Sequence, residues 1–224
     1  MTESDGQNRV RRLLNQTDAD DSQFSDTMLS ELLNQARHIY ADILPQKYMS
    51  NLIKTETIAV GGTYAGHADF PSDFLRPIDN PYVTIDSVSA KKIPEEERWR
   101  LHELENNENT GSGYASTKYY RETSKGIEVY PNTATTIDYE YLAKPTDLSA
   151  VDNTEFAALV DDMCVDFAFQ KCMGTQRGDV QLAVFLAEQQ GILINRLKGI
   201  ETGGLHYRGE PGVPIPQAPP PSTT

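Results

Sequence analysis

Apolar residues recur at helical spacing in three stretches of the chain, and the first of these begins near Phe24. Phe24 offers a hydrophobic staple residue that can pack on Leu29, Ser25 offers an N-cap, and Asp26 places an acid in the first turn. The apolar stripe then continues up to Pro45 through Leu29, Leu32, Leu33, Ala36, Ile39, Tyr40 and Ile43. This pattern predicts one amphipathic helix.

The other two helical stretches follow each other toward the C-terminus. One starts at Asp152–Glu155, which resembles a capping box, and ends at Gly174, whereas the second covers about residues 179–198 and ends at Gly199. Because only about four residues connect them, we expect an antiparallel hairpin, which the first helix completes to a three- or four-helix bundle. The predicted buried stripes are Phe156, Leu159, Val160, Met163, Phe167 and Ala168 in one helix and Leu182, Phe185, Leu186, Gln189, Leu193 and Leu197 in the other.

Between these helices, the period of the pattern changes. β-branched and aromatic residues cluster from about residue 57 to residue 143, and glycines and prolines separate the clusters. The predicted strands are Val83–Val88, Lys118–Arg121, Ile127–Tyr130 and Thr136–Leu142, of which the last three are expected to form a meander.

The two ends of the chain differ from the rest. Residues 1–24 are polar and acidic and predict a flexible arm or a short helix. Residues 200–224 contain six of the 13 prolines and predict an extended arm. We therefore expect an α+β fold that is mainly helical, with a small helical bundle (25–56 and 144–199), a β-meander insert (57–143) and an extended C-terminal arm.

Composition and charge narrow the range of possible functions. The net charge is -13, with 20 basic against 33 acidic residues, which argues against a general nucleic-acid binder and against an anionic membrane surface. Cys164 and Cys172 lie eight positions apart in one predicted helix, about 12 Å along its axis, so that a mutual disulfide is excluded and buried thiols in a reducing compartment are expected. The polar start and the lack of a long apolar run predict a chain without a signal peptide or membrane span, soluble in a cytoplasm.

No arrangement of residues predicts catalysis, and we expect no metal and no cofactor. The four histidines lack metal-ligand spacing, and the glycine pairs lack a phosphate-binding motif. Asp161, Asp162 and Asp166 form an acidic cluster in which Asp162 and Asp166 align along the helix and Asp161 projects about 100° away. Three interpretations are open: a solvated helix face, a lining that keeps DNA from adhering to a passage, or a metal or catalytic site.

The Pro-rich C-terminal segment is the feature most suggestive of function. Its apolar residues alternate with prolines, and such a preordered strand loses little entropy when it docks in a groove or on a sheet edge. We therefore interpret it as a docking arm rather than a disordered terminus. The expected anchors are Leu205, Tyr207, Val213, Pro214, Ile215 and Pro216.

The order of these elements resembles the head-to-tail adaptor (connector) proteins of tailed bacteriophages. The segments that carry the resemblance are Phe70–Ile78, Tyr119–Tyr120, Gly126–Pro131 and Ile137–Leu148, followed by the paired helices. The resemblance implies a non-enzymatic structural subunit in the neck of the virion, synthesised in the host cytoplasm. It also implies a ring, commonly of twelve copies, that lies below the portal protein, extends the DNA channel and supports the tail tube, nozzle or other tail proteins. The C-terminal arm would dock on the portal, and double-stranded DNA would pass through without specific binding.

Two other functions remain open from the sequence. One is a tail-associated hydrolase that uses two carboxylates in a cleft. The other is a monomeric binding module whose Pro-rich tail engages an aromatic-lined domain.

Overall fold

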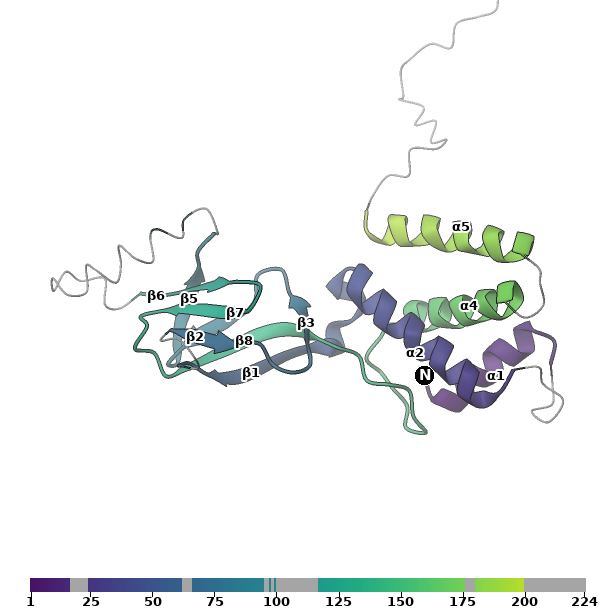
Figure 1. The fold of residues 1–224 in the computed structure, drawn as a ribbon, viewed down its shortest axis with the longest axis horizontal. Coiled ribbons are helices and arrows are strands. Elements are labelled where there is room, and N and C mark those ends of the chain that lie inside the picture. The colour runs from purple at the N-terminus through teal and green to yellow at the C-terminus, as the bar shows by residue number, and fades with distance from the viewer. Residues whose placement is uncertain are drawn as a thin grey trace, which may run out of the picture.

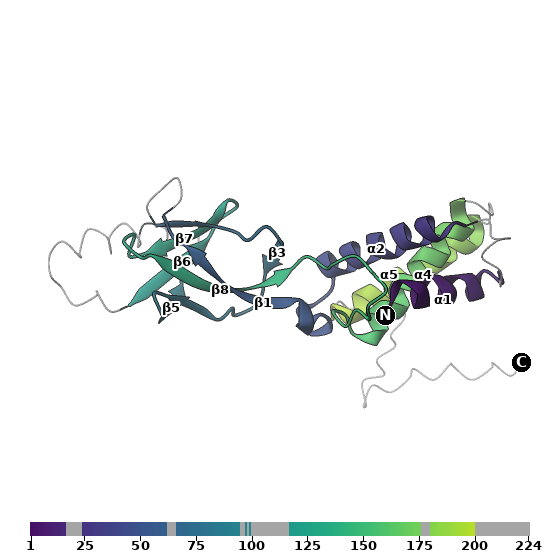
Figure 2. The same cartoon turned by 90° about the horizontal axis from the view of Figure 1, so that it is seen from below.

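The structure is a computed structural model, and it describes residues 1–16, 24–61, 66–94, 97, 99, 117–175 and 180–199. The described part is elongated, with a β-sheet at one end and a group of helices at the other (Figure 1). Each end has its own large hydrophobic core. The view from below shows the same division, with β1 and β8 running from the sheet toward the helices (Figure 2).

The helical end contains four α-helices among the described residues: α1 (Glu3–Leu13), α2 (Asp26–Ile43), α4 (Ala158–Thr175) and α5 (Val180–Leu197). Two short 3₁₀ turns, Gln46–Tyr48 and Ser50–Leu52, lead from α2 into the sheet. The predicted start of α2 is confirmed, because the Ser25 hydroxyl accepts a hydrogen bond from the Met28 N–H at 3.2 Å and Phe24 is fully buried. The predicted hairpin of α4 and α5 is confirmed as well.

Residues 3–13 form a packed helix and not a loose arm. Thr2 caps α1 by accepting a hydrogen bond from the Asp5 N–H at 3.1 Å. Val10 and Leu14 are fully buried in the same core as residues of α2 and α4. The expectation of a flexible arm is therefore wrong and the alternative of a short helix is right, because a short helix is stabilised mainly by packing of its apolar side against the rest of the protein.

The predicted start of the next helix is also wrong. Residues 152–157 are not helical, and α4 begins at Ala158. Glu155 does not cap a helix but accepts hydrogen bonds from the Thr146 N–H and from Arg37. A tertiary ion pair has replaced the local cap that the sequence suggested.

The sheet contains eight strands among the described residues. They are β1 (Ile53–Ala59), β2 (His67–Asp69), β3 (Phe74–Pro77), β4 (Val83–Ile85), β5 (Val88–Lys92), β6 (Lys118–Glu122), β7 (Gly126–Tyr130) and β8 (Thr136–Ala143). Their order is β1-β8-β4-β5-β6-β7-β2, and β3 pairs with β8. The sheet is mixed, because β5 and β6 are parallel and the other pairs are antiparallel.

The expected fold class, a mainly helical protein with a small β-meander insert, is wrong. Of the residues that the structure describes, 44% are helical and 25% are strand, and the eight-stranded sheet curls until it is nearly closed. The two outer strands β1 and β2 approach each other, and the Gly61 N–H after β1 donates to the His67 carbonyl in β2 at 2.9 Å. The predicted meander is correct only for β6 and β7, because β8 leaves them to lie between β1 and β4.

Buried aromatic side chains explain why the sheet curls. Tyr139 and Tyr141 of β8 are fully buried, with parallel rings whose centroids lie 6.3 Å apart, and Phe74 contacts both. Phe70 stacks on Phe74 at 3.9 Å. Large rings on one face of a twisted sheet are removed from water when the sheet closes around them.

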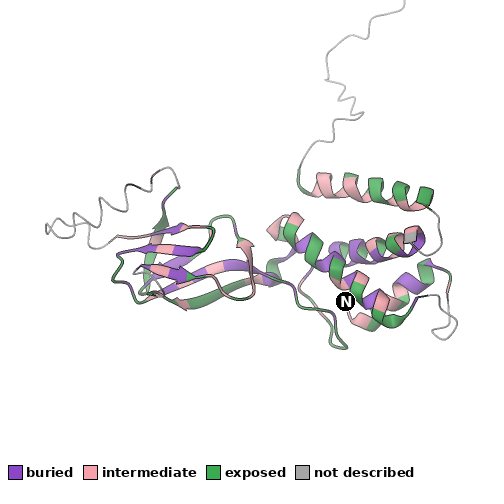
Figure 3. Ribbon diagram, viewed as in Figure 1, coloured by how far each residue is buried: buried purple, intermediate pink, exposed green. Residues whose placement is uncertain are grey.

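The sheet and the helices are connected by more than the two chain crossings. Leu142 of β8 belongs to the core of the helical end, whereas its neighbour Tyr141 belongs to the core of the sheet. The Arg76 guanidinium of β3 donates to the Leu44 carbonyl at the end of α2. Burial follows this arrangement: buried residues concentrate inside the sheet and in α2 and α4, whereas α5 shows only half-buried and exposed residues (Figure 3).

Candidate functional site

The three aspartates that the sequence singled out on α4 differ in their environments. Asp161 is buried, 7% exposed, whereas Asp162 and Asp166 are on the surface of the helix. The Met1 amino group lies 3.3 Å from the Asp161 carboxylate, and Arg37 lies 3.9 Å from it. The trio therefore does not form one continuous acidic face, because one member is turned into the protein.

Arg37 organises the buried charges. Its guanidinium is fully buried, donates to the Glu155 carboxylate at 2.5 Å and to the Thr146 carbonyl at 3.3 Å, and lies 4.6 Å above the ring of Phe156. Burial raises the pKa of Asp161 above its usual value, although the nearby amino group and Arg37 oppose that shift. Arg37 is paired with Glu155, and Asp161 is paired with the Met1 amino group, so that we interpret their arrangement as structural. Arg37 Nη1 and Asp161 Oδ1 lie 3.9 Å apart and form no hydrogen bond among the described residues.

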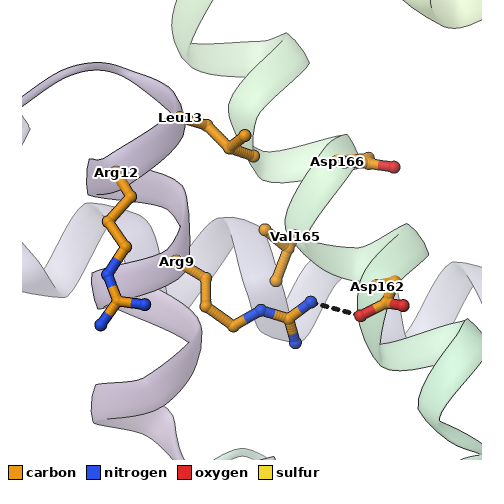
Figure 4. Close-up of a pocket in the computed structure, with 6 residues that line it drawn as sticks. All are labelled: Arg9, Arg12, Leu13, Asp162, Val165 and Asp166. Atoms are coloured by element: carbon orange, nitrogen blue, oxygen red, sulfur yellow. Dashed lines mark hydrogen bonds and ion pairs between the residues drawn. The ribbon is translucent and has the colours of Figure 1, made fainter.

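A pocket of about 440 Å³ lies on the surface between α1 and α4. It is lined by Arg9, Arg12 and Leu13 from α1 and by Asp162, Val165 and Asp166 from α4. Spacings of three and four positions bring each trio onto one side of its helix. Figure 4 shows Arg9 reaching across to Asp162, while Leu13 and Val165 approach each other from the two helices.

The charges of the pocket are only partly compensated. Arg9 pairs with Asp162, and burial together with Asp162 raises the pKa of Asp166, which Arg9 opposes. Arg12 is exposed and has no ion pair with another described residue. The pocket therefore offers an apolar floor and a guanidinium that pairs with no carboxylate of the described residues.

This geometry fits recognition of a side chain better than chemistry on a substrate. Within the ranges that the structure describes, no group of three or more His, Cys, Asp or Glu residues is placed to hold a metal ion. The two cysteines are buried in the core of the helical end, and burial raises the pKa of Cys164 to about 12 and that of Cys172 to about 11. Their thiols stay protonated and are inaccessible.

The outer face of α5 is a functional candidate that the sequence interpretation missed. Phe185 was expected in the buried stripe but is 54% exposed. Three other large apolar residues of α5, namely Val180, Val184 and Ile192, are also exposed. The signal was present in the sequence: these residues form a second apolar stripe beside Leu182, Leu186 and Leu193, and a helix that is apolar on both sides needs two partners.

In the described part of the chain, α5 has one neighbouring helix. It packs on α4, which separates it from α1 and α2 (Figure 1). The exposed stripe therefore faces away from the bundle. Exposed apolar patches of this kind mark sites of protein association.

The predicted docking arm cannot be compared with the structure. Its anchors Leu205, Tyr207, Val213, Pro214, Ile215 and Pro216 lie outside the described residues. Among the helices that are described, none is long and apolar enough to cross a bilayer.

A comparison with protein families gives one match. A family model described as SU10 adaptor protein matches residues 1–208 of the chain. The match includes all the helices and strands described above, and it ends within the Pro-rich segment, so that Leu205 and Tyr207 lie inside it and Val213 and Ile215 beyond it. No curated protein matches the chain.

Proposed function

This chain belongs to the SU10 adaptor protein family, and from that premise we propose that it is a ring-forming subunit of the head-to-tail connection of a tailed bacteriophage. The resemblance that the order of the elements suggested is thereby confirmed at the level of the family. The family supports a structural role in the virion neck, with portal and tail proteins as partners. The ring, its copy number and the contacts are the proposal.

The observation that carries the proposal is the division of the molecule into two ends with separate cores (Figure 1). A protein that connects two assemblies needs two separate surfaces held at a fixed distance. The hydrogen bond from Arg76 of β3 to the Leu44 carbonyl, and the packing of Leu142 of β8 in the core of the helical end, connect the two ends. This construction suits a spacer between a portal and a tail.

We assign the portal side to the helical end. Residues 200–224 follow α5, so that the segment starts from the helical end of the molecule. Its anchors Leu205, Tyr207, Val213 and Ile215 would bind a groove or a sheet edge of the portal. The sheet end would then carry contacts to neighbouring copies and to tail proteins.

Passage of DNA without specific binding agrees with the charge of the protein. The net charge of -13 opposes tight binding of a polyphosphate. Asp161 is buried and would not line a channel, so the proposal depends on the overall charge and not on the acidic cluster as a whole.

Electron microscopy of the protein bound to its portal tests the proposal. We expect a closed ring with an axial channel on the portal, with the helical ends toward it. Deletion of residues 203–224 should leave the circular dichroism spectrum of the folded part unchanged and abolish attachment. A chain that stays monomeric in the presence of portal would reject the ring, and attachment of the truncated chain at wild-type affinity would reject the docking arm.

A further inference from the structure

The exposed stripe on α5 contains a carboxylate as well as apolar residues. Gln181, Phe185, Glu188 and Ile192 are spaced by four, three and four positions, so that their side chains project from one side of the helix. Each of the four is exposed. Glu188 has no ion pair with another described residue. The stripe therefore presents an aromatic ring, a carboxylate three positions later and an aliphatic side chain four positions after that.

The pocket between α1 and α4 presents the complementary set. Val165 at its floor is 3% exposed, and Leu13 at its rim is 49% exposed, so that an apolar side chain would cover Leu13 and rest on Val165. Arg12, one position before Leu13, forms no ion pair with a carboxylate of the described residues. Phe185 of the stripe is complementary to the apolar part of the pocket, and Glu188, three positions later, is complementary in charge to the Arg12 guanidinium.

The two surfaces cannot meet within one molecule. α5 packs on one side of α4, whereas α1 packs on another, with α4 between them (Figure 1). A contact between the stripe and the pocket must therefore join two copies. Because two different surfaces meet, the contact is heterologous. A heterologous contact repeated with a constant rotation closes into a ring where the rotation divides a full turn, and otherwise forms an open filament.

We propose that the α5 stripe of one copy docks in the α1–α4 pocket of the next copy, with Phe185 between Leu13 and Val165 and with Glu188 paired to Arg12. This inference rests on the proposed ring and names the surfaces that build it. Each copy contributes one stripe and one pocket, so that every pocket in a closed ring is filled. The Arg9–Asp162 ion pair remains at the edge of the contact.

Cross-linking on the assembled particle tests the contact. The full-length variant with both Arg12→Cys and Glu188→Cys is bound to portal and treated with a short bis-maleimide, and denaturing gels are compared with electron micrographs of the same sample. We expect a ladder of multimers from the double variant and none from either single variant. The native cysteines do not contribute, because both are buried.

A matched control uses the same helix. Ala187 is exposed but projects about 100° away from Glu188, so the pair Arg12→Cys with Ala187→Cys should give no ladder. Dimers from Glu188→Cys alone would show that two α5 faces meet each other, and would overturn the proposal. A visible ring without cross-links from the double variant would also overturn the proposed contact, as expected if residues 200–224 covered the stripe. That result would leave the proposed function intact. Absence of a ring in the wild-type sample would reject the proposed function itself.

Charge reversal provides a second measurement should the cysteine variants fail to assemble. Arg12→Glu and Glu188→Arg should each lose the ring, and the chain that carries both should regain it. Loss of the ring by Phe185→Asp and by Leu13→Asp, with retention by Ala187→Asp, is expected from the same contact. Retention of the ring by Phe185→Asp, or failure of the double charge reversal to restore it, would contradict the contact.

Discussion

Arg37 and Glu155 are separated by 118 positions in the chain and form a 2.5 Å ion pair in which the guanidinium is fully buried. The pair joins the middle of α2 to the segment that leads from the sheet into α4. The same carboxylate accepts a hydrogen bond from the Thr146 N–H at 3.1 Å. This contact therefore fixes the place where the chain returns from the sheet to the helices.

Loss of the buried cation should be costly. Arg37→Ala leaves Glu155 without its cation and removes the cation above the ring of Phe156, and we expect the free energy of unfolding to fall by about 3–5 kcal/mol. Urea denaturation followed at 222 nm measures the change. Arg9→Ala is the matched control, because the Arg9–Asp162 pair is solvent-exposed and such pairs contribute at most about 1 kcal/mol. Equal losses for the two variants would contradict the structural role of Arg37.

The hydroxyl of Tyr141 should matter for the sheet. It lies 2.7 Å from the Asp73 carboxylate and 3.0 Å from the Glu56 carboxylate, so that its one proton can be donated to either of them, and the ring is fully buried. Tyr141→Phe keeps the ring but removes the donor, and we expect a loss of about 1–3 kcal/mol in the free energy of unfolding. Tyr82→Phe serves as the control, because Tyr82 is exposed, and should leave stability unchanged. If Tyr141→Phe left the free energy of unfolding unchanged, the two carboxylates would not need the hydroxyl as a hydrogen-bond donor.

The sheet should be sensitive to acid. The pKa of Asp73 is lowered mainly by a hydrogen bond from Lys54, that of Asp86 by the backbone N–H of Thr135, and that of Asp138 by two threonine hydroxyls. Unfolded aspartate has a pKa of about 3.9, so the unfolded chain binds more protons at these positions than the folded one. Their contribution to stability is complete above about pH 4 and is lost as the pH falls through the lower folded values.

The helical end should respond in the opposite direction. The pKa values of Asp161 and Asp166 are raised by burial, so the folded state binds protons more readily there, and mild acid adds stability at these positions. On titration below pH 4 we expect the near-ultraviolet signal of the sheet tyrosines to decline before the helical signal at 222 nm. Coincident loss of the two signals would contradict this order.

Two glycines should respond in opposite ways to alanine. A Cβ at Gly126, which has φ +155°, would lie 2.3 Å from the Ala68 carbonyl oxygen of the neighbouring strand β2. Gly126→Ala should therefore break the pairing of β2 with β7. In contrast, a Cβ at Gly191 in α5 meets nothing within 4 Å, and Gly191→Ala should stabilise by up to about 1 kcal/mol, because alanine is the better helix former. Melting temperatures of the two variants, one lower and one higher than wild type, check the pair.

Local patterns predicted the elements that depend on neighbouring residues. The Ser25 cap and the helix that follows it, the α4–α5 hairpin and the strands β6, β7 and β8 were all evident from the sequence. The predicted single strand Val83–Val88 is in fact the hairpin of β4 and β5, with positive φ angles at Asp86 and Ser87. The sequence did not indicate that turn because no glycine marks it.

The candidate site was less predictable than the fold. The charge pattern of the sequence singled out Asp161, Asp162 and Asp166. In the structure, Asp162 and Asp166 line the pocket, whereas Asp161 is buried. Arg12 and Leu13 carried no signal of their own, because each is an ordinary residue of an amphipathic helix, whereas Phe185 belongs to a second apolar stripe of α5 that the sequence interpretation missed. Only the positions of α1 and α5 around α4 give them a role.

By itself, the sequence determined the helical and strand periodicities, the Ser25 cap and the order of elements from which the family was recognised, because these depend on residues a few positions apart. The tertiary structure decided which apolar stripe of α5 packs on α4, that α1 packs into the bundle, and that the strands form one curled sheet around Tyr139 and Tyr141. Those outcomes depend on which distant apolar surfaces exclude water most completely when they meet, and local periodicity carries no information about that choice.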